Sequence, residues 1–172
     1  MLIPFEGINP KLHESVFVAE TACIIGDVEI GENSSVWYNA VIRGDVNYIR
    51  IGEMTNIQDM SMLHVTKETH PLLIGSGVTI GHSVTLHGCT IADACLIGMG
   101  TVILDGAVIG KESIVAAGAV VTEEMRIEPR SLVMGFPAKI KRGVTEKELQ
   151  WIKQSAKNYI SYVKRYRESA KI

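Results

Sequence analysis

The sequence has little of what marks several large classes of protein. It has three cysteines, Cys23, Cys89 and Cys95, and no CxxC pair, which argues against a disulfide framework and against a cysteine zinc cluster. No apolar run reaches membrane-spanning length. The first residues lack the basic region and long apolar core of a signal peptide. We therefore expect a reduced, cytoplasmic setting without a membrane.

An excess of charge of one sign is also missing, since the net charge is −2. From Val144 onwards there are seven Lys and Arg against three Asp and Glu, which leaves ten against sixteen for the rest of the chain. These basic residues are scattered and form no dense run, so we interpret them as a solvated helix face and expect no nucleic-acid partner. With 47% hydrophobic and 21% charged residues, the composition is that of a globular protein.

What the sequence does have is a repeat, in which aliphatic residues recur every six positions. Three extra residues interrupt it before Ile51, a longer insertion precedes Ile74, and one residue is skipped before Ile91. The aliphatic positions are Val18, Ile24, Ile30, Val36, Ile42, Ile51, Ile57, Leu63, Ile74, Ile80, Leu86, Ile91, Ile97, Ile103, Ile109, Val115 and Val121. Four residues after most of them comes a small or modest side chain, such as Ala22, Ala40 or Cys95.

A period of six fits neither an α-helix nor one long strand. It fits a short strand and a corner, with one large and one small side chain pointing inward, which is the hexapeptide pattern of a parallel β-helix. Three such segments close a triangular coil of about 18 residues, and coils stack ~4.8 Å apart. Chance spacing would not keep the large and small positions in phase for about a hundred residues. We predict an all-β fold, a parallel β-helix of about five to six coils.

The predicted domain covers residues 1–143, with a lead-in at 1–17, repeats at 18–122 and a connector at 123–143. A C-terminal α-helix is predicted over residues 144–172. Thr145 and Glu148 form a capping box at its start. Its apolar stripe is formed by Leu149, Ile152, Ala156, Ile160 and Val163. We expect this stripe to lie along the β-helix, in the same or a neighbouring subunit.

Numbering the walls of the prism from Val18 determines where the histidines point. The aliphatic residues of wall one are Val18, Val36, Ile57, Ile80 and Ile97, and those of wall two are Ile24, Ile42, Leu63, Leu86 and Ile103. Both interruptions must be bulges or loops that keep the register. The second is a loop within residues 65–72, around His70 and Pro71.

Arg43, His64 and His87 each follow a wall-two aliphatic residue, so they form one outward column in successive coils. His64 and His87 are then neighbours at ~4.8 Å, and two imidazoles at that distance can converge on one metal. His82 lies on wall one, in a column with Asp59. In a threefold assembly, wall one of one subunit can face wall two of the next. We therefore expect a homotrimer with metal sites at its interfaces.

Each of these residues also has a structural interpretation. A surface histidine is usually only a polar residue, which is how we interpret His13 and His70. Cys89 is near His87 and a thiolate binds zinc, but it lies at a shortened corner, so we interpret it as filler. Cys95 occupies a small inward position, which predicts a core residue.

Together, several short motifs resemble those of a known protein family. The motifs are Arg43-Gly44-Asp45, Asn56-Ile57-Gln58-Asp59, Leu63-His64, Ile80-Gly81-His82 and Leu86-His87-Gly88-Cys89-Thr90-Ile91. In them, and over about residues 5–170, the chain resembles the γ-class carbonic anhydrase family, including its short-loop bacterial homologues. The joint set of motifs is specific, whereas the hexapeptide repeat alone is not. The resemblance implies a left-handed coil.

The resemblance also implies a role for each matching residue. His64, His82 and His87 match the three metal ligands, two from one subunit and one from the next. The ion would be zinc first, with cobalt or iron(II) as alternatives. Arg43 and Asp45 match a pair that forms a salt bridge across the trimer interface. Asp59 matches a further carboxylate at the interface or behind a ligand.

Three further matches concern the reaction. Asn56 and Gln58 match polar residues near the metal-bound solvent, and Tyr159 matches an active-site tyrosine on the helix. The implied activity is reversible hydration of CO₂ to bicarbonate, in which a metal-bound hydroxide attacks the carbon. A proton then passes to buffer, often through a shuttle group.

The sequence departs from the family pattern where that shuttle is expected. Archetypal members carry a glutamate just after the Arg-x-Asp unit and an acidic loop after the first histidine. Here Val46 takes the first place, and Glu68 is the only acid in the short loop of residues 65–72.

Two other functions therefore stay open beside a metal-dependent lyase. One is a non-catalytic metal-binding trimer with a scaffold or assembly role. The other is a CoA-dependent acyltransferase, weakly indicated by the segment of residues 135–139. That fold usually needs one catalytic histidine, so three histidines in two columns argue against it.

Overall fold

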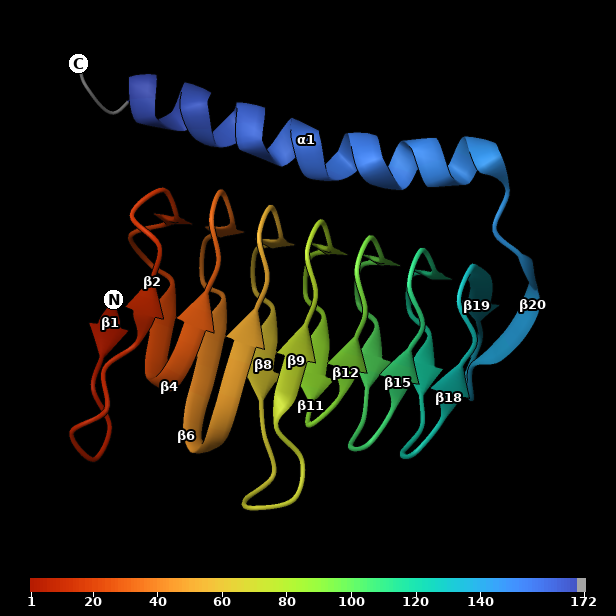
Figure 1. Ribbon diagram of the computed structural model, residues 1–172, viewed down its shortest axis with the longest axis horizontal. Coiled ribbons are helices and arrows are strands. Elements are labelled where there is room, and N and C mark those ends of the chain that lie inside the picture. Colours follow the sequence, from red (N-terminus) through yellow and green to blue (C-terminus); the bar gives the residue numbers. More distant parts are fainter. Residues whose placement is uncertain (170–172) are drawn as a thin grey trace.

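The computed structural model describes residues 1–169, and the last three residues of the predicted helix lie outside this range. The chain winds into a parallel β-helix of about seven turns, followed by one long helix (Figure 1). The fold class predicted from the six-residue period is confirmed.

The three walls of the prism are built from short parallel strands. Wall one consists of β3 (Phe17–Val18), β5 (Ser35–Val36), β7 (Asn56–Ile57), β10 (Thr79–Ile80), β13 (Leu96–Ile97), β16 (Ile114–Val115) and β19 (Ser131–Met134). Wall two consists of β1 (Leu2–Ile3), the first parts of β4 (Cys23–Ile30) and β6 (Val41–Ile51), β8 (Met62–His64), β11 (Thr85–His87), β14 (Val102–Ile103) and β17 (Val120–Val121). Wall three consists of β2 (Lys11–Leu12), the later parts of β4 and β6, β9 (Leu72–Ile74), β12 (Thr90–Ile91), β15 (Val108–Ile109) and β18 (Arg126–Ile127).

The repeat extends beyond the range predicted for it. After Val121, the side chains of Ile127 and Val133 continue the six-residue spacing and are buried, and β18 and β19 pair with the coil before them. Part of the predicted connector is therefore a seventh coil, closed by β20 (Lys139–Gly143), which runs antiparallel to β19. The lead-in also contributes strands, because β1 and β2 both pair with β4.

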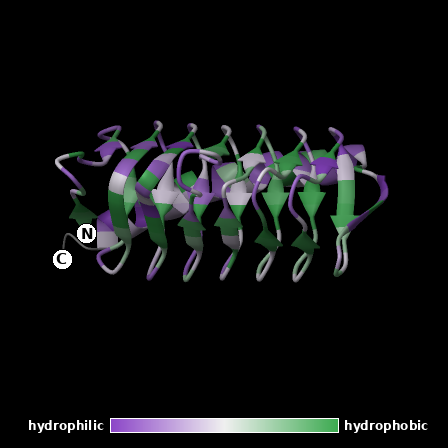
Figure 2. Ribbon diagram, turned by 90° about the horizontal axis from the view of Figure 1, so that it is seen from below, coloured by the Kyte–Doolittle hydropathy of each residue, from purple (hydrophilic) through white to green (hydrophobic). Residues whose placement is uncertain are grey.

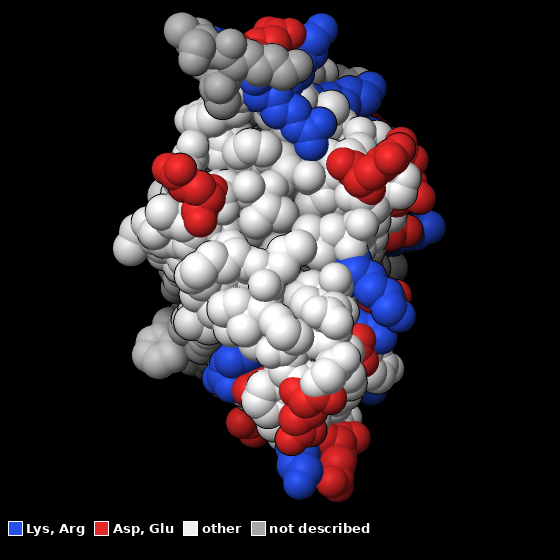
Figure 3. Space-filling view, turned by 90° about the vertical axis from the view of Figure 1, so that its left-hand side faces the viewer, with Lys and Arg blue, Asp and Glu red and all other residues white. Residues whose placement is uncertain are grey.

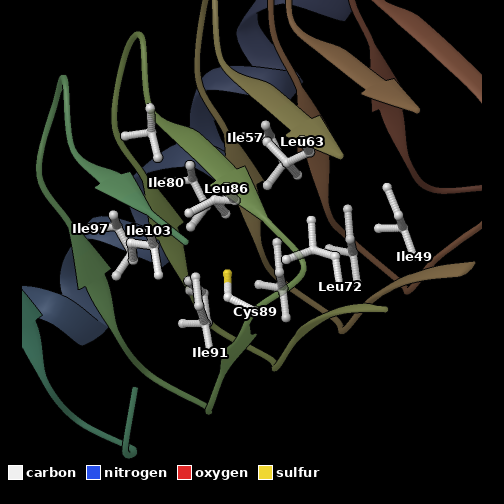
Figure 4. Packing of buried hydrophobic residues seen from close by; sticks show 14 of the residues in the cluster. Ile49, Ile57, Leu63, Leu72, Ile80, Leu86, Cys89, Ile91, Ile97 and Ile103 are labelled. Carbon is white, nitrogen blue, oxygen red and sulfur yellow. The ribbon is translucent and has the colours of Figure 1, made fainter. Parts of the chain in front are cut away.

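The inward aliphatic residues stack on one another from coil to coil and form the core (Figure 4). Ile24, Leu63, Leu86 and Ile103 are all completely buried. Figure 2 shows the consequence, since hydrophobic strand segments recur along the whole length of the stack. Large side chains in register keep water out of the interior along the whole stack. The contacts between neighbouring coils therefore stabilise the solenoid, and no coil is stable alone.

The first interruption is a bulge that keeps the register. Gly26 pairs with Gly44, and the next pair joins Val28 to Ile49. One residue of β4 and four residues of β6 therefore lie between these two pairs. The three extra residues lie between Gly44 and Ile49, and Asp45 is the first residue after Gly44. The second interruption is the loop of residues 65–71, which a bridge between Thr66 and His70 closes.

Helix α1 (Glu146–Ser169) runs along the stack and lies on wall one, against β5 and β10 (Figure 1). Its buried residues are Leu149, Ile152, Ala156 and Val163, which confirms the predicted stripe at these positions. The capping box is also present, because the Thr145 amide donates to Glu148 Oε2 at 2.8 Å and the Glu148 amide donates to Thr145 Oγ1 at 3.3 Å.

The far end of α1 is fixed to the first coils. Trp37 packs edge-on against Tyr159 and Tyr166, with ring centroids 5.5 and 5.1 Å away. Arg167 Nη2 donates to the backbone oxygens of Ser15 and Val16, at 2.9 and 3.2 Å. The helix therefore connects the last coil of the stack to the first.

Figure 3 shows the N-terminal end of the stack, where few charged side chains lie near the centre. The exposed apolar residues of the first strands and their turn are Met1, Leu2, Phe5 and Ile8. Within residues 1–169, no helix is long and apolar enough to cross a membrane.

Candidate metal centre

The stacked pair of histidines has the geometry that the register predicted. Strands β8 and β11 pair in parallel with Leu86 opposite Leu63 and His87 opposite His64. The ring centroids are 5.0 Å apart, and His64 Nδ1 lies 3.0 Å from His87 Nε2. One nitrogen of each ring is thus directed at the other ring.

A carboxylate holds the outer nitrogen of each of these rings. Asp45 Oδ1 lies 3.0 Å from His64 Nε2, and Asp105 Oδ1 lies 2.6 Å from His87 Nδ1. A neutral imidazole that donates its proton to a carboxylate keeps a lone pair on the other nitrogen. With the proton of each ring on its outer nitrogen, His64 Nδ1 and His87 Nε2 are the nitrogens that would bind an ion placed between them.

His82 lies apart from this pair, at the corner that follows wall one. Its Nδ1 is 2.8 Å from Asp59 Oδ2, so the predicted His82–Asp59 column is a direct contact. The His82 side chain is 49% exposed, compared with 17% for His64. Within residues 1–169, no three His, Cys, Asp or Glu side chains gather into a metal-binding cluster. One chain therefore brings together two of the three predicted ligands.

Arg43 lies in the column of the pair and contacts Asp45 of its own chain, with Nη1 2.5 Å from Oδ2. Burial alone would raise the pKa of Asp45, but hydrogen bonds from Arg43 and His64 outweigh it and lower the pKa below its ordinary value. Asp45 therefore stays a carboxylate and keeps its bond to His64. The predicted salt bridge across a trimer interface stays a prediction.

Gln58 and Asn56 lie on wall one, on the side of His82. Gln58 Nε2 donates to Asn56 Oδ1 at 3.1 Å, and Asn56 Nδ2 donates to Thr79 Oγ1 at 3.0 Å and to the Val78 carbonyl at 3.4 Å. Thr79 Oγ1 is in turn 3.1 Å from Ser155 Oγ on α1. The Val78 carbonyl can only accept a hydrogen bond, so it fixes which group donates and which accepts in each of these hydrogen bonds. Gln58 therefore presents its amide oxygen away from Asn56.

Tyr159 lies on α1 near the same group. With Gln58, Thr79 and Gly81 it lines a cavity of about 490 Å³ between wall one and the helix. Burial raises the pKa of Tyr159 to about 12, with a further contribution from the charge of Asp59. The tyrosine is thus a neutral hydroxyl near Asp59.

The loop after His64 has no acid directed at the pair among the described residues. Glu68 is 81% exposed and lies 3.7 Å from Lys67 Nζ. His70, interpreted from the sequence as a surface residue, is 3.3 Å from Glu124. Cys89, labelled in Figure 4, and Cys95 are both buried in the core, as predicted, and burial raises the pKa of each thiol to about 12.

Sequence reasoning missed Asp105 and Thr66. Asp105 follows His87 by 18 residues, one complete coil, which is the signal that could have identified it. Thr66 donates its hydroxyl to Asp105 Oδ2 at 2.6 Å. Burial would raise the pKa of Asp105, but the hydrogen bonds from Thr66 and His87 lower it overall.

The donor set fits a divalent metal of the zinc type. Free imidazole nitrogens with a carboxylate behind each ring are the usual surroundings of histidine ligands to zinc. A parallel β-helix with histidines at two different corners is therefore the class of protein that the fold and this geometry define.

Comparison with known proteins agrees with this class. Residues 88–123 match the family model "Bacterial transferase hexapeptide (six repeats)". The "Probable carbonic anhydrase" of Methanocaldococcus jannaschii is 54% identical over 87% of this chain and 93% of its own length. The "Gamma carbonic anhydrase 2, mitochondrial" of Arabidopsis thaliana is 48% identical over 89% of this chain, which spans 57% of that relative. The chain belongs to the γ carbonic anhydrase family.

Solved structures share the fold closely. A hexapeptide transferase family protein from Anaplasma phagocytophilum has a TM-score of 0.92 at 42% identity, covering 96% of this chain and 97% of its own. A putative acetyltransferase from Bacillus cereus has a TM-score of 0.94 at 40% identity, covering 97% and 96%. The names of these two proteins differ from those of the curated relatives in the chemistry that they indicate.

Proposed function

We propose that this chain is a metal-dependent carbonic anhydrase that interconverts CO₂ and bicarbonate at the interfaces of a homotrimer. The observation that carries the proposal is the facing pair of His64 and His87 nitrogens, 3.0 Å apart, each ring held from behind by a carboxylate. Family membership supports the same reaction.

In this proposal the third ligand comes from a neighbouring subunit. His82 is half-exposed and Asp59 holds its Nδ1, so its Nε2 is the nitrogen that can bind a metal. A cyclic trimer brings wall one of each subunit to wall two of the next and completes three equivalent sites. The ion is most simply zinc, with cobalt and iron(II) as alternatives.

Held by the imidazoles of His64, His87 and His82, a divalent ion would supply a hydroxide nucleophile at neutral pH. Around it, the chain's own residues orient the reactants. The Gln58 amide oxygen faces away from Asn56 and accepts a hydrogen bond from the site. Tyr159 stays a neutral hydroxyl donor because its pKa is about 12. Asp45, Asp59 and Asp105 hold the ligand rings in one tautomer.

The test is stopped-flow CO₂ hydration on protein loaded with Zn²⁺, Co²⁺ or anaerobic Fe²⁺, with metal content measured in the same samples. About one metal per chain is expected, and either His64→Ala or His82→Ala should remove it. His13→Ala is the matched control, because among the described residues the His13 side chain hydrogen-bonds only to Ser15. Metal-free protein prepared without chelator would reject the proposal.

A second candidate is a non-catalytic metal-binding trimer with a scaffold role. The observation that favours it is the exposed Glu68, which leaves the loop after His64 without an acid directed at the pair among residues 1–169. This protein would bind metal but show no CO₂ hydration with any of the three ions. The third candidate, an acyltransferase, is supported by the names of structural neighbours such as the putative acetyltransferase from Bacillus cereus. Turnover of acetyl-CoA would establish it.

We also keep a cytoplasmic location as part of the proposal. Cys23, Cys89 and Cys95 are all free thiols, which fits a reducing compartment.

A further inference from the structure

The carboxylate of Asp105 has both of its oxygens engaged near the candidate metal centre. Oδ1 lies 2.6 Å from His87 Nδ1, and Oδ2 accepts from the Thr66 hydroxyl at 2.6 Å. The side chain is 26% exposed. Hydrogen bonds to an ionised carboxylate are short and strong, so two of them on opposite oxygens fix its rotation. Asp105 therefore holds the His87 ring in one orientation.

A glycine makes this approach possible. A Cβ at Gly88, the residue after His87, would lie 2.3 Å from Asp105 Oδ1 and 2.7 Å from His70 Cβ. Gly88 also has a φ of +50°, in the left-handed region that favours glycine. Any other residue at position 88 would push the carboxylate away from His87.

A similar corner exists elsewhere in the coil without a histidine. A Cβ at Gly75 would lie 2.3 Å from Asp93 Oδ1, and that oxygen accepts from the Ser76 amide at 2.8 Å. An aspartate over a corner glycine is thus part of the coil architecture. What distinguishes Asp105 from Asp93 is that its oxygens contact a histidine ring and a loop hydroxyl instead of a backbone amide.

Thr66 is itself held by the loop that begins after His64. Its amide donates to the His70 carbonyl at 3.0 Å, which closes the loop. Its carbonyl accepts from Asn47 Nδ2, in the bulge of β6, at 3.0 Å. The backbone of Thr66 is therefore fixed on both sides, and its hydroxyl is directed at Asp105.

We propose that Asp105 and Thr66 are positioning residues for His87, and that the short loop of residues 65–71 is a clamp that sets the metal affinity of the site. The clamp keeps the proton of His87 on Nδ1 and leaves Nε2 free for the ion. This inference rests on the proposed function, because it takes His87 as a metal ligand. It gives the short loop a role other than proton transfer.

The experiment measures the affinity of the full-length protein for Zn²⁺ by competition with a chromophoric chelator. Asp105→Asn should weaken binding about 10–100-fold, the usual effect of removing the group behind a ligand. Thr66→Val should weaken it several-fold, and Thr66→Ser, which keeps the hydroxyl, should restore it. Nitrogen-15 NMR of the metal-free proteins should show His87 protonated on Nδ1 in the wild type, with a larger Nε2–H fraction in Asp105→Asn.

Asp93→Asn is the matched control, since it changes a corner aspartate that contacts no histidine, and its Zn²⁺ affinity should equal that of the wild type. The inference fails if Asp105→Asn binds Zn²⁺ within about twofold of the wild type, or if Asp93→Asn loses as much affinity. If Asp105→Asn does not fold, the comparison of Thr66→Val with Thr66→Ser decides. A wild type that binds no Zn²⁺ overturns the proposed function as well, so the two failures are distinguishable.

Discussion

The three cysteines illustrate how position in the coil determines the chemistry of a side chain. Cys89 and Cys95 point into the core, where burial raises the pKa of each thiol to about 12. Cys23 begins β4 and is partly exposed. Only the thiolate is a strong nucleophile, so burial suppresses reactivity twice, through access and through protonation.

We therefore expect one reactive thiol in the folded protein. At pH 8, a disulfide reagent such as DTNB should titrate Cys23 alone, because this pH lies far below the raised pKa of the other two thiols. All three should react after denaturation. The Cys23→Ser variant is the control and should show no fast reaction. Fast reaction of a second thiol in the native wild type would contradict the buried placement.

A second prediction at the scale of single residues concerns Gln58. Gln58→Leu keeps the volume of the side chain but removes the amide oxygen that Asn56 directs toward the site. We expect kcat/KM for CO₂ hydration to fall about 3- to 10-fold, the value of one hydrogen bond, with metal content unchanged. Gln154→Leu, on the exposed face of α1, is the matched control. Equal activity of Gln58→Leu and wild type would remove Gln58 from the mechanism.

Individual residues were predictable where the repeat determines their direction. The six-residue spacing of the aliphatic positions predicted that His64 lies beside His87 and that His82 lies in one column with Asp59. Asp105 did not follow, because aspartate also occupies corners for purely structural reasons, as Asp93 shows. Spacing gives direction but does not say which partner a carboxylate contacts.

At the scale of elements, helix α1 was predictable from its cap and stripe, whereas the end of the repeat was not. Val121, Ile127 and Val133 keep the six-residue phase, but Pro129 and the polar residues around it indicated a loop. The structure accommodates them at a corner between β18 and β19. Backbone pairing with the coil below thus overrides local sequence signals.

The start of α1 gives a prediction on stability. Thr145→Ala removes the hydroxyl that accepts from the Glu148 amide, so the free energy of unfolding should fall by about 1 kcal/mol. Chemical denaturation measures this. Ser169→Ala, near the other end of the helix, is a control that removes a side-chain hydrogen bond to the Arg165 carbonyl. An unchanged free energy for Thr145→Ala would mean that packing alone determines where the helix begins.

The same helix start should respond to pH. Hydrogen bonds from Arg142, and then from Thr145, lower the pKa of Glu148 well below its usual range. Because its folded pKa lies below the unfolded value of about 4.3, the stabilisation is complete above that pH and is lost as the pH falls further. Glu148→Gln should therefore destabilise the protein at pH 7, and the difference should shrink below about pH 4. A constant difference between pH 7 and pH 3 would contradict this.

At the scale of the whole molecule, a shared site can be tested by mixing defective subunits. His64→Ala and His82→Ala chains each lack part of every site when they assemble alone. Co-expressed in equal amounts, they should recover about a quarter of the wild-type metal content, because a site needs His64 from one chain and His82 from its neighbour. Co-expressed His64→Ala and His87→Ala chains are the control and should recover none. Zero recovery in both mixtures would place the site within one chain.

Because α1 contacts both ends of the stack, its length can be compared with that of the β-helix. Its 24 residues span about 36 Å, and the six intervals between seven coils span about 29 Å, so the helix is about 7 Å longer than the stack. One added coil would lengthen the stack by ~4.8 Å, or about three helical residues. Three residues are less than a full turn, so inserting them within the helix would rotate the apolar stripe beyond the insertion by about 60° relative to wall one. The spare length of the helix therefore covers one added coil, whereas an insertion of three residues into the helix would turn part of its apolar stripe away from wall one.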